Sequence, residues 1–208
     1  MPDQSAGATL PSQWLISFLL LSLSTLLPGC NSSDNSSGMS SQLTRGFLLS
    51  GGVPIVSATV TVYSSSDGNG DDPHKFVGRS NDGYCYTQSQ LNSWMSVDLG
   101  AERTVVPTHY CLRNSAHNGH ASRNWTLEGR AADAGAEDWQ QIKRHDNDGT
   151  QAAQRFSVGA WPVDAGGRAF RHLRVRQHGR NAHNGADNND SLLCCGFEVY
   201  GRLLDAEA

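Results

Sequence analysis

The stretch AFRHLRVRQHGRN, residues 169–181, contains the alternation that decides the fold. At its centre, Leu173 and Val175 are separated by single polar residues. Successive side chains of a β-strand point to opposite faces, so this pattern predicts a strand that buries both apolar residues. Four further segments show the same alternation: WMSVDLG (94–100), THYCLR (108–113), NWTLEGR (124–130) and CGFEVYG (195–201). Short strands separated by Gly, Asn and Asp clusters predict an all-β sandwich.

The arginines of the opening stretch fall into two groups. Arg174 and Arg176 alternate with the core residues, so we expect them on the outer face of the sheet, paired with acids such as Glu128 or Glu198 on neighbouring strands. Arg180 follows the end of the strand, in a loop. Only Arg180 is therefore expected to be available to a ligand.

Composition excludes several classes of function. The chain has 208 residues, enough for one domain with a hydrophobic core, and its net charge is −4, with 16 basic and 20 acidic residues. A protein that coats nucleic acid needs a clustered positive field, so no nucleic-acid partner is expected. The sequence holds no nucleophile elbow, phosphate loop or paired-carboxylate motif, and we expect no enzymatic activity.

The N-terminus predicts export. Residues 1–29 contain the apolar run LISFLLLSLSTLL (15–27), which is too short to span a bilayer and is typical of a signal peptide. The run leads to Gly29 and Cys30, which resembles the lipobox of bacterial lipoproteins, although Pro28 and the absence of basic residues before the run depart from that pattern. The resemblance implies lipidation at Cys30 and a cell-envelope lipoprotein, with plain secretion as the alternative.

Three segments separate the signal from the main domain. Residues 30–42 are rich in Ser and Asn and predict a flexible tether. Residues 43–63 predict a β-hairpin appended to the main domain, which resembles the start of a carboxypeptidase-regulatory-like sandwich. Residues 64–73 are interpreted as a linker. Asp67, Asn69 and Asp71 have the spacing of a calcium loop, but Gly78 stands where the last acidic ligand is needed. No cofactor is therefore expected, and a structural calcium ion has no support.

Six collinear motifs carry a family resemblance. SWMSVDLG, VPTHYCLRN, ASRNWTLEGR, DWQQIKRHDND, AFRHLRVRQHGRN and LLCCGFEVYG follow one another as in the discoidin domain, the coagulation factor 5/8 type C module. The resemblance is to the variant attached to BTB and HECT ubiquitin-ligase scaffolds. It covers about residues 74–203, leaves 204–208 as a tail, and implies a galactose-binding-like jelly roll that binds glycans, phospholipid head groups or proteins in loops at one end.

Three Arg-Asn pairs at strand ends are the candidate ligand-binding residues. An arginine fork beside an amide suits sugar hydroxyls or a carboxylate. Arg123 has an alternative role, in which it anchors a loop through backbone carbonyls. The pairs are Arg113 with Asn114, Arg123 with Asn124, and Arg180 with Asn181. We expect a glycan as the ligand; a protein partner bound through the same loops is the alternative.

Aromatic residues complete the expected site. Sugar rings pack on aromatic faces, which Tyr84, and also Tyr86 or Trp161, can supply. The other strand-associated tryptophans, Trp94, Trp125 and Trp139, are assigned to the core. His117, His120 and His183 suggest a metal site, with simple exposure on loops as the alternative. Exposure is favoured because zinc-type ligand spacing is missing.

The remaining cysteines allow two interpretations. An oxidising compartment favours disulfides, for which Cys85 with Cys194 is the candidate pair. The alternative is that Cys111 and the vicinal Cys194 and Cys195 are small buried hydrophobic residues.

Overall fold

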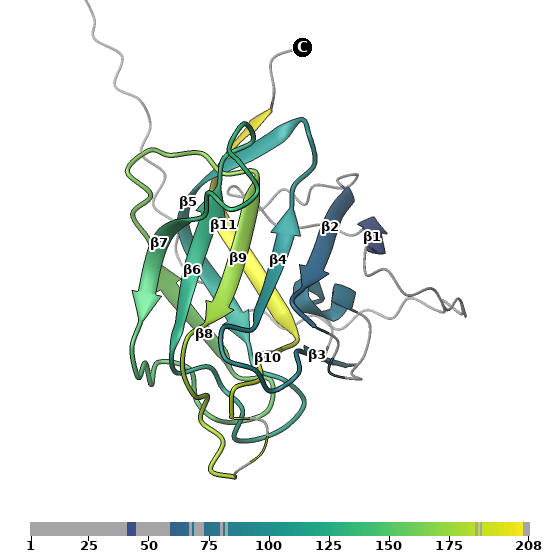
Figure 1. Cartoon of the computed structure of the whole chain (residues 1–208), viewed down its shortest axis with the longest axis vertical. Helices are drawn as coiled ribbons and strands as arrows, with labels where there is room; N and C mark the ends of the chain where they lie inside the picture. Colours follow the sequence, from purple (N-terminus) through teal and green to yellow (C-terminus); the bar gives the residue numbers. More distant parts are fainter. Residues whose placement is uncertain are drawn as a thin grey trace, which may run out of the picture. The chain divides into compact units, whose positions relative to one another are not determined.

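The computed structural model describes residues 41–44, 59–66, 68, 73–79, 81, 83–185, 187 and 189–205. These residues form an all-β sandwich in which a six-stranded and a three-stranded sheet enclose one core (Figure 1). Among them the only helical segment is a short 3₁₀ turn, η1 (Pro73–Val77), and no helix is long and apolar enough to cross a membrane. The expected fold class is confirmed.

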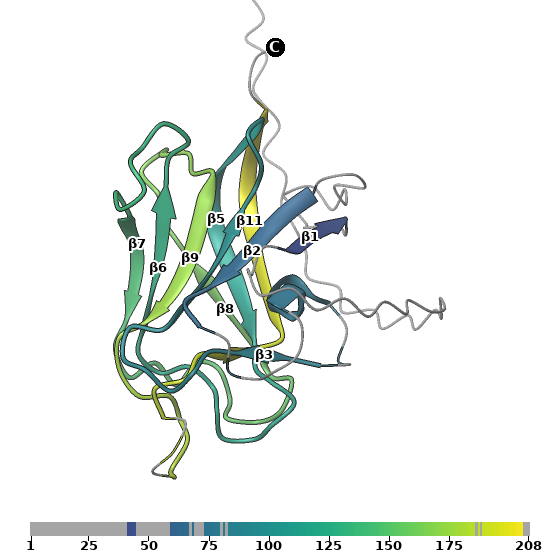
Figure 2. The ribbon, with the colours of Figure 1, turned by 45° about the vertical axis from the view of Figure 1, so that its right-hand side comes forward.

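Every strand pair in the sandwich is antiparallel. The larger sheet has the order β1 (Ser41–Thr44), β2 (Thr59–Ser64), β4 (Trp94–Asp98), β9 (His172–Gln177), β6 (Trp125–Arg130) and β7 (Gln140–His145). The smaller sheet has the order β11 (Gly196–Asp205), β5 (Arg103–Arg113) and β8 (Val158–Pro162), and it crosses behind the larger one in Figure 1. A two-stranded ladder, β3 (Cys85–Tyr86) with β10 (Leu193–Cys194), lies at one end of the sandwich (Figure 2).

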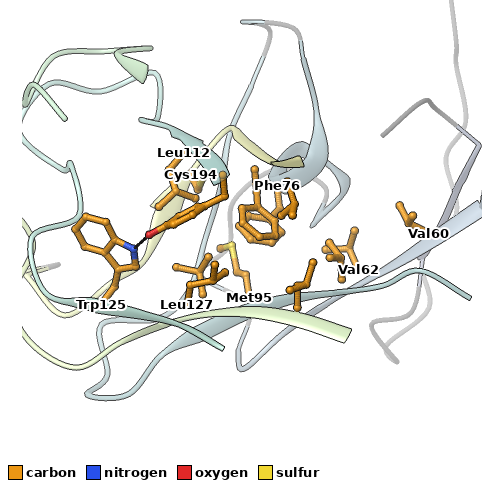
Figure 3. Close-up of a cluster of buried hydrophobic side chains, with 14 of the residues drawn as sticks. Val60, Val62, Phe76, Met95, Leu112, Trp125, Leu127 and Cys194 are labelled. Atoms are coloured by element: carbon orange, nitrogen blue, oxygen red, sulfur yellow. Dashed lines mark hydrogen bonds between the residues drawn. The ribbon is translucent and has the colours of Figure 1, made fainter. Parts of the chain in front are cut away.

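The core follows the alternation in the sequence. Leu173 and Val175 of β9 are fully buried, as are the inward residues of the four other expected strands. Those residues are Met95, Val97, Leu99, Tyr110, Leu112, Trp125, Leu127, Phe197 and Val199. Phe76 of η1 stacks on Phe197, with ring centroids 5.0 Å apart. Figure 3 follows this core from Trp125 to Val60.

Two strands before residue 74 are part of the sandwich. β1 begins inside the stretch predicted as a tether and pairs with β2, and the predicted turn at Gly51-Gly52 lies outside the described residues. Because β2 also pairs with β4 inside the larger sheet, these strands belong to the domain and are not an appendage. Val60 and Val62 of β2 belong to the core cluster. The reason is that β4 would otherwise expose an unpaired edge beside the apolar face that it buries. At the other end of the chain, Leu204 and Asp205 extend β11, so part of the expected tail is strand.

The outer face of the larger sheet confirms the first arginine prediction. Arg174 and Arg176 both bind the buried carboxylate of Glu128, at 2.6 and 2.9 Å. The core assignment holds for Trp125 but is wrong for Trp94 and Trp139, which are half-buried. Both pack against the guanidinium of Arg174, with Trp139 the closer at 4.0 Å. Side chains on β4 alternate between the two faces of the sheet, and Met95 and Val97 point into the core. Trp94 therefore lies on the outer face.

The second interpretation holds for Cys194 and Cys195, which are buried, but not for Cys111, which is only half-buried. Cys85 and Cys194 lie opposite each other on β3 and β10, but no disulfide forms among the described residues. The Cys85 thiol donates to the carbonyl of Cys194 at 3.4 Å, and the Cys194 thiol donates to the carbonyls of Arg113 and Gly196. Burial raises the pKa of Cys194 to about 12, which keeps it in the unreactive thiol form.

A chain of hydrogen bonds crosses the core beside the smaller sheet. The indole N–H of Trp125 donates to the hydroxyl of Tyr110 at 2.9 Å, the dashed bond in Figure 3. The Tyr110 hydroxyl lies 2.7 Å from Nε2 of His145, and it donates to this nitrogen when the neutral ring carries its proton on Nδ1, facing Asp148. His145 is therefore neutral and donates from Nδ1 to Asp148, which also accepts from the indole of Trp161. Burial lowers the pKa of His145, in keeping with the neutral form.

Candidate functional site

The loops at one end of the sandwich meet the β3–β10 ladder. The loop after β5 (114–124) and the loop after β9 (178–192) both reach this end, at the bottom of Figures 1 and 2. The register pairs Tyr86 with Leu193 and thus forms a floor between the two loops. A concave site is therefore assembled from segments that are far apart in the sequence.

A cavity of about 400 Å³ opens on this floor. Among the residues that the structure describes, its lining consists of aromatic, imidazole, amide and hydroxyl groups, with one leucine and one glycine, and without a carboxylate, lysine or arginine. The lining residues are Gly68, Tyr84, Tyr86, Gln88, Ser89, His117, His120 and Leu193. The volume lies within the range of small-molecule sites.

Two tyrosines form an aromatic wall. Tyr84 stacks on Tyr86 with ring centroids 5.7 Å apart, and His117 meets the Tyr84 ring edge-on at 4.8 Å. The Tyr84 hydroxyl lies 2.8 Å from Nε2 of His117, a hydrogen bond that fixes both rings. Gly68 packs directly on the other tyrosine, since a Cβ at this position would come within 2.3 Å of the Tyr86 ring. The wall is thus supported on both sides.

Three histidines cluster beside this wall. His120 stacks on His183 with ring centroids 4.2 Å apart and planes at 11°, and His117 lies 6.3 Å from His120. Burial lowers the pKa of His120, and the neighbouring His183 and His117 lower it further. Nδ1 of His120 is buried and has no hydrogen-bond partner among the residues that the structure describes. In the part of the chain that the structure describes, no three His, Cys, Asp or Glu side chains converge in a metal-binding arrangement.

Two of the predicted asparagines position these histidines. Asn114 is buried, and its amide donates to the carbonyls of Gln154 and His117, which holds the loop that carries His117. Asn181 is also buried; it donates to Ser191 and accepts the backbone N–H of His183. Both amides are therefore occupied by loop backbone and do not line the cavity.

The second predicted pair also holds loops together. Arg123 donates to the carbonyls of Ser122, Asp148 and Gln151, which is the anchoring role given above as its alternative. The amide of Asn124 donates to the carbonyl of Arg180 and accepts from the backbone of Asn147. These bonds tie the loop before β6 to the loops that follow β7 and β9.

The two remaining arginines lie outside the cavity lining. Arg113 extends from β5 toward Glu198 of β11, with 3.9 Å between its guanidinium and the carboxylate. Arg180 is exposed, and among the described residues its guanidinium forms no hydrogen bond or ion pair. Trp161, considered above as a stacking face, is buried in the core instead. Of the residues considered above as ligand contacts, the structure places Tyr84 and Tyr86 in the described lining of the cavity, and none of the Arg-Asn pairs.

Sequence reasoning gave no binding role to His117 and His120. Each histidine of the cluster lies on a Gly- and Asn-rich loop, and no fixed spacing connects the loop of His183 with that of the other two. Their proximity depends on the two loops meeting at the same end of the sandwich. The one available signal was the recurrence of His in both loops, which the sequence interpretation weighed only as a metal site.

The sequence comparisons find relatives for part of the chain. No family model matches it. A segment of 123 residues is 35% identical to the E3 ubiquitin-protein ligase hecd-1 of Caenorhabditis elegans, and one of 124 residues is 32% identical to the E3 ubiquitin-protein ligase Ufd4 of Drosophila melanogaster. Each match covers 58% of this chain but only 4% of the ligase, so the chain corresponds to a small segment of these enzymes.

The solved structures most useful for comparison are carbohydrate-binding modules. The CBM32-3 module of a family 31 glycoside hydrolase from Clostridium perfringens has a TM-score of 0.53 and 12% identity, over 67% of this chain and 88% of that one. The module CpGH89CBM32-5 from the same organism, solved with GalNAc-β-1,3-galactose, has a TM-score of 0.50 and 10% identity, over 68% and 95%. At these identities the likeness concerns the fold. The described chain is thus an all-β sandwich, similar in fold to CBM32 modules and in sequence to a small segment of two E3 ubiquitin-protein ligases.

Proposed function

We propose that this chain is a non-catalytic binding module that holds a carbohydrate in the cavity between Tyr84 and His120. The observation that carries the proposal is the cavity itself, in which a stacked pair of tyrosines stands beside imidazoles at the loop end. The C–H faces of a pyranose pack on such rings, while imidazole, amide and hydroxyl groups exchange hydrogen bonds with sugar hydroxyls. The carbohydrate-binding modules among the structural neighbours support this class of ligand.

The absence of catalysis rests on the chemistry of the cavity. Its described lining holds no carboxylate, and glycoside hydrolysis generally requires a pair of them. The triad-like Tyr110–His145–Asp148 chain lies elsewhere, with Tyr110 fully buried in the core. A substrate cannot reach its hydroxyl without unfolding of the sandwich. Binding is therefore the function that the described side chains support.

Isothermal titration of the full chain, guided by a glycan array, tests this proposal. We expect Tyr84→Ala to weaken the best glycan at least tenfold, because it removes the stacking face and the partner of His117. Tyr63→Ala is the matched control, since Tyr63 is 37% exposed on β2, outside the cavity lining. Equal affinities for the two variants, or an array without any bound glycan at millimolar concentration, would overturn the proposal.

A protein partner at the same end is the second candidate. It is favoured by the two relatives, which are segments of large ubiquitin ligases. In this case the exposed Arg180, and not the tyrosine wall, is expected to carry the binding energy, because arginine is enriched at protein interfaces. Arg180→Ala would then abolish capture of the partner, while Tyr84→Ala would leave it intact.

We further propose that the chain is exported and anchored through a lipid on Cys30. Residues 1–40 lie outside the described residues, so this proposal rests on the sequence alone. Asp67, Asn69 and Asp71, which have the calcium-like spacing, also lie outside the described residues. Cys30→Ser is expected to move the protein from the membrane fraction to the soluble fraction. Unchanged sedimentation with membranes would contradict the anchor.

A further inference from the structure

We infer that the sugar bound in the cavity carries a carboxylate, and that the cluster of His117, His120 and His183 takes up one proton as it binds. This inference rests on the proposed carbohydrate site and names its class of ligand. Its basis is the cavity lining, in whose described part the only groups able to become positively charged near neutral pH are imidazoles. The described lining includes no carboxylate that would repel an anionic sugar.

The stacked pair of His120 and His183 disfavours more than one additional charge on its two rings. The rings of His120 and His183 lie 4.2 Å apart and nearly parallel, so two imidazolium ions there would repel each other strongly. Without a ligand, burial and this proximity hold the pKa of His120 below its ordinary value. A ligand carboxylate supplies the missing counter-charge and favours the protonated form.

Hydrogen bonding around the cluster is compatible with the added proton. The Tyr84 hydroxyl donates to Nε2 of a neutral His117 and accepts from a protonated one, so this bond survives in both states. Nδ1 of His183 lies 3.1 Å from the carbonyl of Asp187 and 3.3 Å from the backbone nitrogen of Gly185, so it donates to the carbonyl when it carries a proton and accepts from Gly185 when it does not. Nδ1 of His120 has no hydrogen-bond partner among the described residues, so a new hydrogen bond or counter-charge beside this ring would stabilise it.

The charged residues on the surrounding loops contact the cluster and the cavity through their backbone. The carbonyl of Asp187 lies 3.1 Å from Nδ1 of His183, and the backbone N–H of Asp190 donates to Ser89. The backbone N–H of Arg155 donates to Asn118, and Arg180 is exposed. Within the described ranges no carboxylate forms an ion pair with the three imidazoles. A carboxylate on the ligand would therefore be the counter-charge of the protonated cluster.

The test compares galacturonic acid with galactose, two sugars that differ only in the carboxylate at C6. Titration of the full chain is performed at pH 7.5 and pH 5.5, in two buffers of different ionisation enthalpy to count the protons exchanged. Uptake of one proton tightens binding by up to about tenfold per pH unit in the window where the site titrates. We expect galacturonic acid to bind at least tenfold more tightly at pH 5.5 with uptake of up to one proton, and galactose to change less than threefold.

His120→Gln is the variant that isolates the cluster. It keeps a polar side chain but cannot be charged, so the preference for galacturonic acid and the proton uptake should both disappear. His109→Gln is the matched control: burial lowers the pKa of His109 too, but its ring stacks on Tyr200 in the smaller sheet. If His120→Gln fails to fold, as judged by circular dichroism, His183→Gln tests the same pair from the other ring.

The outcomes separate this inference from the proposed function. Equal affinity for the two sugars at both pH values, or proton uptake that persists in a folded His120→Gln protein, would overturn the acidic-sugar inference and leave carbohydrate binding in place. Absence of binding by either sugar, together with an empty glycan array, would instead defeat the proposed function.

Discussion

Removal of the Tyr110 hydroxyl tests the hydrogen-bonded chain through the core. Tyr110→Phe keeps the ring, which stacks on Trp161 with centroids 5.2 Å apart, and deletes only the oxygen that joins Trp125 to His145. The substitution leaves no cavity larger than one oxygen atom. Its cost therefore reports the polar chain and not the packing of the core.

The magnitude follows from the two groups that lose their partner. The indole N–H of Trp125 is fully buried, and Nε2 of His145 belongs to a residue only 4% exposed, so water cannot replace the hydroxyl. Each buried group without a partner costs about 1–3 kcal/mol, and the protein no longer has to bury the hydroxyl itself. We expect the free energy of unfolding to fall by about 2–4 kcal/mol, at the upper end of tyrosine-to-phenylalanine effects.

Urea denaturation followed by tryptophan fluorescence measures this change, with an unaltered m-value as evidence that the unfolding reaction is the same. Tyr200→Phe is the matched control. Its hydroxyl donates to Glu198 on the half-buried outer side of β11, where solvent can compensate, so about 0.5–1.5 kcal/mol is expected. A cost for Tyr110→Phe below about 1 kcal/mol, or no larger than that of the control, would refute the argument that the chain is a closed donor–acceptor sequence.

Three further expectations concern stability. Burial lowers the pKa of four histidines, His109, His120, His145 and His172. The unfolded chain binds these protons more tightly than the folded one, so the stabilisation from the neutral histidines is complete above a pH of about 6.5. It should fall as the pH drops toward the lower pKa values of the folded state. A melting temperature that is flat or rises from pH 7 to pH 5 would contradict this. Gly201→Ala should unfold the domain or cost more than about 2 kcal/mol by thermal melting, because its Cβ would lie 2.0 Å from the carbonyl of Val106 at the β-bulge, and a cost within about 0.5 kcal/mol would show that the bulge adapts. Glu128→Ala should lower the free energy of unfolding in urea by about 2–4 kcal/mol, since it removes the shared partner of Arg174 and Arg176. Arg176→Ala should lower it by less than about 1 kcal/mol, because that side chain is 36% exposed. A cost for Glu128→Ala as small as that for Arg176→Ala would mean that the carboxylate is dispensable.

Strand alternation was sufficient to predict the sandwich, while other parts of the fold were not accessible to it. Leu173 and Val175 are typical of the success, because a buried face repeats every second residue whatever lies above it. β8 was missed because its sequence, VGAWP, contains Gly and Pro, which are unfavourable in strands, and only the packing of Trp161 in the core explains why it forms one.

The candidate site was predicted by its region and not by its residues. The Arg-Asn pairs mark the loop ends correctly, but an amide at a strand end serves a loop backbone as well as it serves a ligand, and the sequence does not distinguish the two. Asn114 and Asn181 took the first role. The histidine cluster depends on contacts between loops, which no local pattern encodes.

The pairing of β2 with β4 has a consequence for how this module can be handled. A fragment cut at residue 74, where the family-like motifs begin, would lose Val60 and Val62 and leave the long edge of β4 open to another chain. Such a fragment would be expected to self-associate through that edge. A fragment for expression or for fusion to another protein should therefore start before β1 and keep residues 64–73, which were interpreted as a linker.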